Sequence, residues 1–273
     1  SPASPPPLQR FAINFPNSHP QSDLPYLRVA LSRDGARMVL AANNGQSRGL
    51  YLRNRDRGDF TLIDDTASAR VPSFSPDGQW VGYYDQSSGE LRKIAVEGGS
   101  PVTICKVATP VSGASWATDE TLVFATGLEP SGFEAGTGLM RVSTNGGEPE
   151  VLTKPDRGQP ETSHQFPSVL PGGRGVLFTI TAEGNGGTRI AVLDRPSGKW
   201  RVLLEGGSGG EYVGSGHLLY VSRNTLHAVP FDLDRLELTG AAVPLVDDVA
   251  VARAGAGAPQ YAISRAGTLV YAR

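Results

Sequence analysis

One short motif in the sequence resembles a catalytic signature. Residues 45–49 read GQSRG, which matches the Gly-x-Ser-x-Gly pattern around the nucleophile of serine hydrolases. That chemistry needs the serine on a sharp turn between a strand and a helix, with a histidine and an acid beside it. Here Ser47 lies in a polar loop between two segments that alternate like β-strands. We therefore expect no catalytic role for Ser47.

The histidines and the cysteine show no metal-binding spacing. No pair among the four histidines has the spacing of a local zinc motif, and the single cysteine offers no second thiolate; these residues are His19, His164, His217, His227 and Cys105. His164 is the best candidate for a site because it precedes a predicted inner strand near a channel mouth. The plainer interpretation, which we favour, is a loop histidine hydrogen-bonded to the backbone. We expect Cys105, on an apolar strand, to be a buried small hydrophobe.

Paired acids are the remaining source of chemistry, either as general acids and bases or as calcium ligands. Neighbours on a strand point to opposite faces, so the adjacent pairs at 64–65 and 247–248 do not converge on one ion. Asp232 and Asp234 share a face but fall in a long hairpin turn, where a solvated turn is the better explanation. The sequence thus predicts no catalytic residue, no cofactor and no metal site.

The elements that would position any site are repeated hairpins. The segment VPSFSPDGQWVGYY, residues 71–84, is a strand, a tight turn and a second strand, and five further segments follow the same plan. Their turns, 42 to 53 residues apart, end at Gly35, Gly78, Glu120, Gly173, Gly216 and Gly267. A repeat of about 40–45 residues is typical of four-stranded propeller blades. Asp77 therefore reads as a turn residue.

Composition agrees with an all-β chain. It has 34 glycines and 21 prolines, many in turn contexts, and no long apolar stripe with a helical period. The net charge is −2 with acids and bases interspersed, so nucleic-acid binding has no electrostatic basis. No apolar run approaches about 18 residues, so this segment is not expected to insert into a membrane.

The repeats predict a six-bladed β-propeller preceded by a Pro-rich linker. The linker covers residues 1–9 and the single propeller domain residues 10–273. The last repeat has only two strands, so we expect the alternating segment RFAINFP, residues 10–16, to join it and close the ring. The predicted blades cover residues 26–66, 67–108, 109–158, 159–206, 207–249, and 258–273 together with 10–16.

Position within the repeat also suggests where a ligand would bind. Loops and channel mouths carry function in propellers, because the strands are committed to packing. The candidates at the channel mouth, each placed just before an inner strand, are Tyr26, Arg70, His164, Tyr212 and Gln260. The tryptophans Trp80, Trp116 and Trp200 fall on blade strands, where we expect them to pack rather than to stack on a ligand.

Several segments resemble one family of propellers. The segment SFSPDGQWVGYY resembles the WD-like SPDG repeat of TolB-type propellers. More distinctive are LMRVSTNGGEPEVLT, SHQFPSVLPGGRGVLFT and above all LHAVPFDLDRLELTGAAVPLVDDV. In this order, over residues 10–273, they are similar to the propeller found C-terminal to bacterial serine/threonine protein kinases.

That resemblance implies a non-catalytic sensor or binding domain, extracytoplasmic or periplasmic, in a receptor-like kinase. Its partner would be a protein or small-molecule ligand at the channel mouth or loop face. No kinase motif lies in these 273 residues, so phosphotransfer is not expected of this chain. The alternatives are a propeller hydrolase or lyase with its site in the central channel, and a non-catalytic scaffold fragment of a prolyl-oligopeptidase-like hydrolase.

Overall fold

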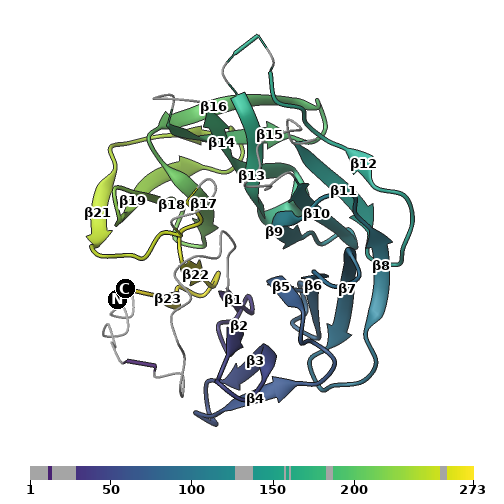
Figure 1. Ribbon diagram of the computed structural model, residues 1–273. Coiled ribbons are helices and arrows are strands. Elements are labelled where there is room, and N and C mark those ends of the chain that lie inside the picture. The colour runs from purple at the N-terminus through teal and green to yellow at the C-terminus, as the bar shows by residue number, and fades with distance from the viewer. Residues whose placement is uncertain are drawn as a thin grey trace.

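The protein is an all-β propeller in which antiparallel sheets surround a common axis (Figure 1). The structure, a computed structural model, describes residues 12–13, 29–126, 138–156, 158–159, 161–182, 187–252 and 257–273. The strands β1, β5, β9, β13, β17 and β22 lie nearest the axis, and later strands of each sheet lie further out.

The first three blades are four-stranded meanders. The first contains β1 (Val29–Leu31), β2 (Arg37–Asn43), β3 (Arg48–Asn54) and β4 (Phe60–Ile63). The second contains β5 (Ala69–Phe74), β6 (Trp80–Asp85), β7 (Glu90–Ala95) and β8 (Val102–Lys106). The third contains β9 (Val111–Trp116), β10 (Thr121–Thr126), β11 (Leu139–Ser143) and β12 (Glu150–Val151).

The fourth and fifth blades are larger. The fourth contains β13 (Glu161–Val169), a short 3₁₀ turn η1 (Pro171–Gly173), β14 (Gly175–Ala182), β15 (Thr188–Asp194) and β16 (Lys199–Glu205). The fifth contains β17 (Ser208–Val213), β18 (His217–Ser222), β19 (Thr225–Asp232), β20 (Glu237–Leu238) and β21 (Val243–Val246). Both β20 and β21 pair with β19, at its two ends.

The sixth repeat forms a sheet of only two strands, β22 (Tyr261–Ile263) and β23 (Leu269–Tyr271). The described residues therefore form five complete blades rather than the six predicted. The expected closing strand, residues 10–16, falls mostly outside the described residues; Ala12 and Ile13, which are described, lie in no strand.

The two-stranded sheet is held between the fifth and first blades. Ala266 N donates to the carbonyl oxygen of Arg33 at 3.3 Å, and the Tyr261 hydroxyl donates to the carbonyl oxygen of Gly209. A Cβ on Gly35 would lie 2.5 Å from Thr268 Oγ1, which shows how closely the two turns approach. The described contacts thus bring the two ends of the repeat array together.

Apolar clusters lie between successive blades and join them. Val81 and Leu50, for example, share one cluster across the first and second blades. Further clusters join the second to the third, the third to the fourth, the fourth to the fifth, and the fifth to the sixth. Cys105 and Trp116 are buried in the cluster between the second and third blades, with Trp80 partly buried against it, and Trp200 packs against the next one. Packing is thus the observed role of the cysteine and the tryptophans.

The inner turns confirm that Asp77 is structural. Its carboxylate accepts hydrogen bonds from Ser75 Oγ at 2.5 Å and from Gln79 N at 3.0 Å. The first blade repeats this arrangement with Asp34 and Ser32. This Ser-x-Asp-Gly turn satisfies the backbone locally and needs no ligand.

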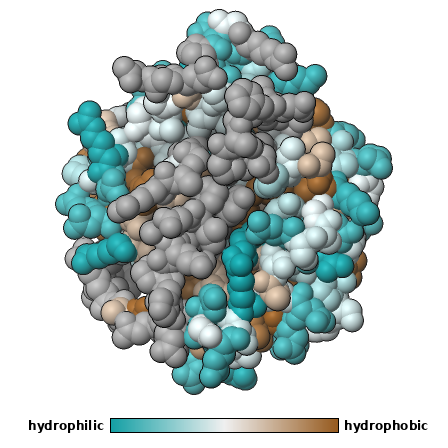
Figure 2. Space-filling model, in the orientation of Figure 1, coloured by the Kyte–Doolittle hydropathy of each residue, from teal (hydrophilic) through white to brown (hydrophobic). Residues whose placement is uncertain are grey.

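Polar side chains are prominent at the rim of the molecule on the side drawn in Figure 2. Figure 2 shows hydrophilic side chains around much of the rim of the face seen in Figure 1. The large hydrophobic side chains exposed among the described residues lie on the outer strands β8, β12 and β21, and they are Val102, Val151, Val243 and Leu245. No helix among the described residues is long and apolar enough to cross a membrane.

Candidate functional site

The predicted channel-mouth residues do not form one cluster. Arg70 is buried, and its guanidinium donates to the carbonyl oxygen of Ala69 at 2.8 Å. Tyr212 is half-buried and packs edge-on against Phe231, between the fourth and fifth blades. Gln260 is half-buried, and its side chain donates to Ala258 O at 3.0 Å. The fourth candidate, His164, lies between the third and fourth blades, and Tyr26 lies outside the described residues.

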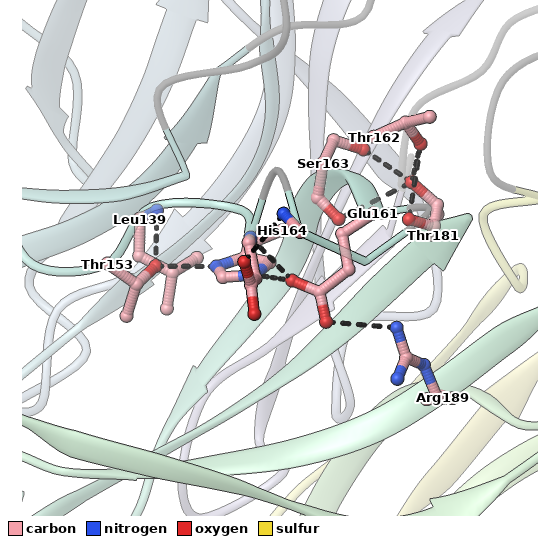
Figure 3. Close-up of polar contacts among 10 residues, drawn as sticks. Leu139, Thr153, Glu161, Thr162, Ser163, His164, Thr181 and Arg189 are labelled. Carbon is pink, nitrogen blue, oxygen red and sulfur yellow. Dashed lines mark hydrogen bonds and ion pairs between the residues drawn. The ribbon is translucent and has the colours of Figure 1, made fainter. Parts of the chain in front are cut away.

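His164 belongs to a sealed polar cluster (Figure 3). It lies within β13 rather than in a loop before it, and its side chain is fully buried. Its ring contacts Phe178 and Trp200, with centroid distances of 4.8 and 5.3 Å. The expected backbone hydrogen bond is replaced by one to a side chain: Nδ1 lies 2.7 Å from Thr153 Oγ1.

The Glu161 carboxylate assigns the tautomer of this histidine. Nε2 faces Glu161 Oε2 at 3.5 Å, and a carboxylate oxygen only accepts, so the ring proton is assigned to Nε2. Nδ1 then accepts from the Thr153 hydroxyl, whose oxygen also accepts from Leu139 N at 3.0 Å. Burial lowers the pKa of His164, against the opposing effect of the Glu161 carboxylate, so the neutral ring is favoured.

Glu161 occupies the centre of this cluster. Its Oε1 accepts from the Arg189 guanidinium at 3.0 Å and its Oε2 from Asp156 N at 2.8 Å. The side chain is 2% exposed. A histidine, an acid and a hydroxyl do meet here, but the histidine and the acid are buried, and His164 Nε2 faces the Glu161 carboxylate without forming a hydrogen bond. The cluster joins the third and fourth blades.

The other sequence motifs are also structural. Ser47 lies between β2 and β3, where its backbone N–H donates to Asn44 Oδ1 at 2.8 Å. Asp232 Oδ1 accepts from the backbone N–H groups of Asp234 and Arg235, as expected of a turn. No group of three or more metal-ligating side chains occurs within the described part of the chain.

One titratable group near the axis was missed by the sequence analysis. Glu211 lies on β17 and is half-buried as a residue. Burial by the surrounding strands raises the pKa of Glu211 to about 8, against an opposing hydrogen bond from the backbone N–H of Ile263. At neutral pH this side chain is therefore mostly a neutral carboxylic acid, which can donate a hydrogen bond.

The repeat shows that Glu211 is an exception. Glu211 lies two residues before the first residue of the turn that follows the inner strand. In the other blades this position carries small residues, which are Ala30, Ser73, Ser115, Ser168 and Ala262. In the third blade, Ser115 Oγ accepts a hydrogen bond from Val169 N of the next blade at 2.9 Å. Val169 and Ile263 are themselves equivalent positions, so Glu211 makes the contact that a serine makes elsewhere. The sequence signal was an acid at a position of small residues.

Comparison with known proteins identifies the type of fold. Searches with family profiles and among curated proteins found no match. Among solved structures, TolB from Acinetobacter baumannii superposes with a TM-score of 0.64 at 14% identity, covering 86% of this chain and 55% of that one. A putative TolB from Agrobacterium tumefaciens has a TM-score of 0.64 at 15% identity, covering 90% of each chain. This is a TolB-like propeller fold.

The same fold occurs with other activities. Hydrazine synthase from Kuenenia stuttgartiensis matches with a TM-score of 0.57 at 15% identity, over 94% of this chain and 76% of that one. The chain also spans little more than half of the Acinetobacter TolB. At these identities the likeness establishes the TolB-like fold and leaves the activity to be argued from the residues.

Proposed function

We propose that this chain is a non-catalytic binding propeller that takes a protein or small-molecule ligand at the mouth of its central channel. The observation that carries the proposal is Glu211. The contact to the next blade needs only a serine at this position, as Ser115 demonstrates. Glu211 instead places a larger, ionisable group on a half-buried residue of the inner strand, and we assign that group to ligand binding.

The environment of the described histidines supports binding over catalysis. His164 is sealed by packing, His217 Nδ1 bonds locally to Ser215, and His227 stacks on Tyr220 at 5.3 Å. The groups that influence Glu211 are the Ile263 backbone and the Tyr261 hydroxyl, and the latter already donates to carbonyl oxygens. Among the described residues, no nucleophile and base are brought together at Glu211.

A propeller hydrolase or lyase remains the second candidate because of the same residue. A carboxylic acid with a pKa near 8 is protonated at neutral pH and suits a general acid. Turnover of an ester, glycoside or uronide substrate that disappears in Glu211→Gln would support this alternative.

Selection of peptide ligands tests the binding proposal. A library of random peptides displayed on phage is selected against the folded chain, and the enriched peptides are measured by calorimetry on wild type, Glu211→Ser and Glu97→Gln. Glu211→Ser keeps the short oxygen that the neighbouring blade uses, and Glu97 is a control with an 82% exposed side chain. We expect at least tenfold weaker binding to Glu211→Ser only. Enriched peptides that bind all three proteins equally would overturn the proposal.

We further propose that the chain is the extracytoplasmic part of a bacterial receptor-like serine/threonine kinase. The support is the family resemblance of residues 10–273, above all the VPFDLDRLELTG segment, together with the TolB-like fold. The encoding gene should then specify a kinase domain and a membrane-spanning segment before residue 1. A reading frame without them would refute this placement and leave the binding role to be judged separately.

A further inference from the structure

Two arginines occupy equivalent positions in neighbouring blades, where the innermost strands end. Arg33 follows β1 in the first blade, and Arg265 follows β22 in the sixth. The other blades carry uncharged residues at this position, which are Pro76, Thr118, Pro171 and Gly214. The hydrogen bond from Ala266 N to Arg33 O ties the two turns together at 3.3 Å. The backbone thus brings two cationic side chains into proximity.

Neither guanidinium has a partner among the described residues. Both side chains are half-buried, and neither makes a hydrogen bond or an ion pair with any residue that the structure describes. Arg195, on a turn between outer strands, instead reaches Asp119 at 2.8 Å and Gly173 O at 2.8 Å. Partly desolvated cations without a counter-charge are unfavourable, so an anionic partner would stabilise them.

The surrounding charges do not neutralise the pair. Asp77, on the second blade, attracts Arg33, but its carboxylate is already held by Ser75 and Gln79. Burial, with repulsion from Arg265, lowers the pKa of Arg33 below its usual range. Burial likewise lowers the pKa of Arg265, against a smaller opposing effect of Tyr212. The region therefore keeps an excess of positive charge at neutral pH.

We infer that Arg33 and Arg265 form an anion-binding site for a carboxylate group of the ligand. This inference rests on the proposed function, since it names the chemistry that the mouth of the ring would recognise. The planar guanidinium donates two parallel hydrogen bonds to a carboxylate, and partial burial limits the rotamer entropy lost on binding. Each carboxylate group carries one negative charge, whereas a phosphate group carries nearly two at neutral pH, so Asp77 repels a bound carboxylate group less than a bound phosphate group.

The carboxylate has two possible sources, an acidic peptide or a free organic acid. The probes are therefore sodium succinate and the peptide acetyl-Gly-Ser-Gly-Ser-Asp-Glu. The uncharged control is the same peptide with Asn-Gln in place of Asp-Glu and an amidated C-terminus. Binding is followed by the side-chain Nε–Hε signals of arginine in ¹H–¹⁵N spectra. Wild type is compared with Arg33→Gln and Arg265→Gln, and with Arg235→Gln, a control whose side chain is 76% exposed beside Asp232.

We expect saturable shifts of two arginine signals, at least tenfold weaker binding in Arg33→Gln and Arg265→Gln, and unchanged binding in Arg235→Gln. A preference of tenfold or more for the acidic peptide over succinate assigns the peptide as the source, and the reverse assigns the free acid. Equal binding to all variants, or no saturable binding of either probe, would overturn the inference. The affinity is also measured at 50 and 300 mM NaCl, and it should be lower at the higher salt concentration.

This outcome is separable from that of the proposed function. If phage-selected peptides require Glu211 but tolerate Arg33→Gln and Arg265→Gln, the binding role holds and the anion site is refuted. If succinate binds the arginines but no selected peptide depends on Glu211, the anion site holds and the proposed ligand position is wrong.

Discussion

Glu211 shows how one residue can depart from a repeat that is otherwise regular. It keeps the contact to the next blade that Ser115 makes, and it adds an ionisable group near the axis. Its raised pKa has a measurable consequence for the whole fold, because the protonation of a group in the folded state is linked to stability.

The stability of the protein should therefore decline as pH rises. The folded chain holds the Glu211 proton with a pKa of about 8, against an ordinary value of 4.5, so its stabilisation is complete below about pH 4.5 and is lost as pH rises through about 8. We expect a loss on the order of 3 kcal/mol, less than the full shift implies because the residue as a whole is only half-buried. Urea unfolding of wild type and Glu211→Gln at pH 5, 6.5 and 8 measures it.

The Gln variant should show a flatter dependence on pH over this range, since its side chain does not ionise. Glu97→Gln, with its exposed side chain, should retain the wild-type slope. A wild-type slope in Glu211→Gln would show that another group carries the dependence.

The buried cluster around His164 makes a second prediction at this scale. Glu161→Ala leaves the Arg189 guanidinium and the Asp156 N–H without their acceptor, inside a packed interface between blades. We expect a loss of about 3–5 kcal/mol of unfolding free energy, as for other broken buried ion pairs. Glu237→Ala, which removes a 56% exposed partner of Arg201, should change stability by about 1 kcal/mol or less. Equal losses of unfolding free energy in Glu161→Ala and Glu237→Ala would show that the buried cluster stabilises the fold no more than an exposed ion pair does.

At the scale of the element, turn chemistry identified the inner hairpins, because Gly and Asp at these turns satisfy local geometric needs. Gly35, Gly78 and Gly267 all have positive φ in the structure. The interior of the inner strands was less predictable. Val71 and Phe166 have φ of 54° and 50° next to shifts in strand register, an unusual conformation for bulky residues.

The bounds of the inner strand explain why Tyr212 was selected. It was predicted to lie just before an inner strand, but β17 (Ser208–Val213) contains both Tyr212 and Glu211, and its register shifts between Ser208 and Glu211. A sequence reveals the period of a repeat, but a bulge depends on how neighbouring blades approach. The polar clusters are unpredictable for the same reason, since Thr153 and His164 meet across two blades.

Trp116 tests the packing between elements. It is 8% exposed within the cluster that joins the second and third blades. We expect Trp116→Ala to lower the unfolding free energy by about 3–5 kcal/mol, measured by urea or thermal unfolding. Trp80→Ala should cost less, because that ring is only partly buried and lies under Lys93. A fully stable Trp116→Ala variant would contradict the packing assignment.

At the scale of the molecule, the ring depends on its smallest sheet. β22 and β23 are the only strands described in the sixth repeat, and they contact the fifth and first blades through Gly209 and Arg33. Closure of a propeller removes the exposed edges that would otherwise permit association with other chains.

A pair of matched glycines isolates the contribution of closure. Gly35 and Gly78 have the same φ of 70° at equivalent turns, but a Cβ on Gly35 would meet Thr268 and Ser264, whereas on Gly78 it would meet only Ser32 at 3.8 Å. We expect Gly35→Ala to be more destabilising than Gly78→Ala by about 1–3 kcal/mol in thermal unfolding. Equal losses of stability in the two variants would mean that backbone strain at positive φ, rather than the contact with the sixth repeat, accounts for both.

The side-chain acceptors between neighbouring blades have a consequence for hydrogen–deuterium exchange. Val169 N is bonded to Ser115 Oγ of the previous blade, and Gly209 N to Thr179 Oγ1 of the previous blade. Most protected amides in a sheet report that their own sheet is intact, whereas these two report that two sheets are touching. Their deuteration rates should therefore rise as soon as blades separate, before any blade unfolds.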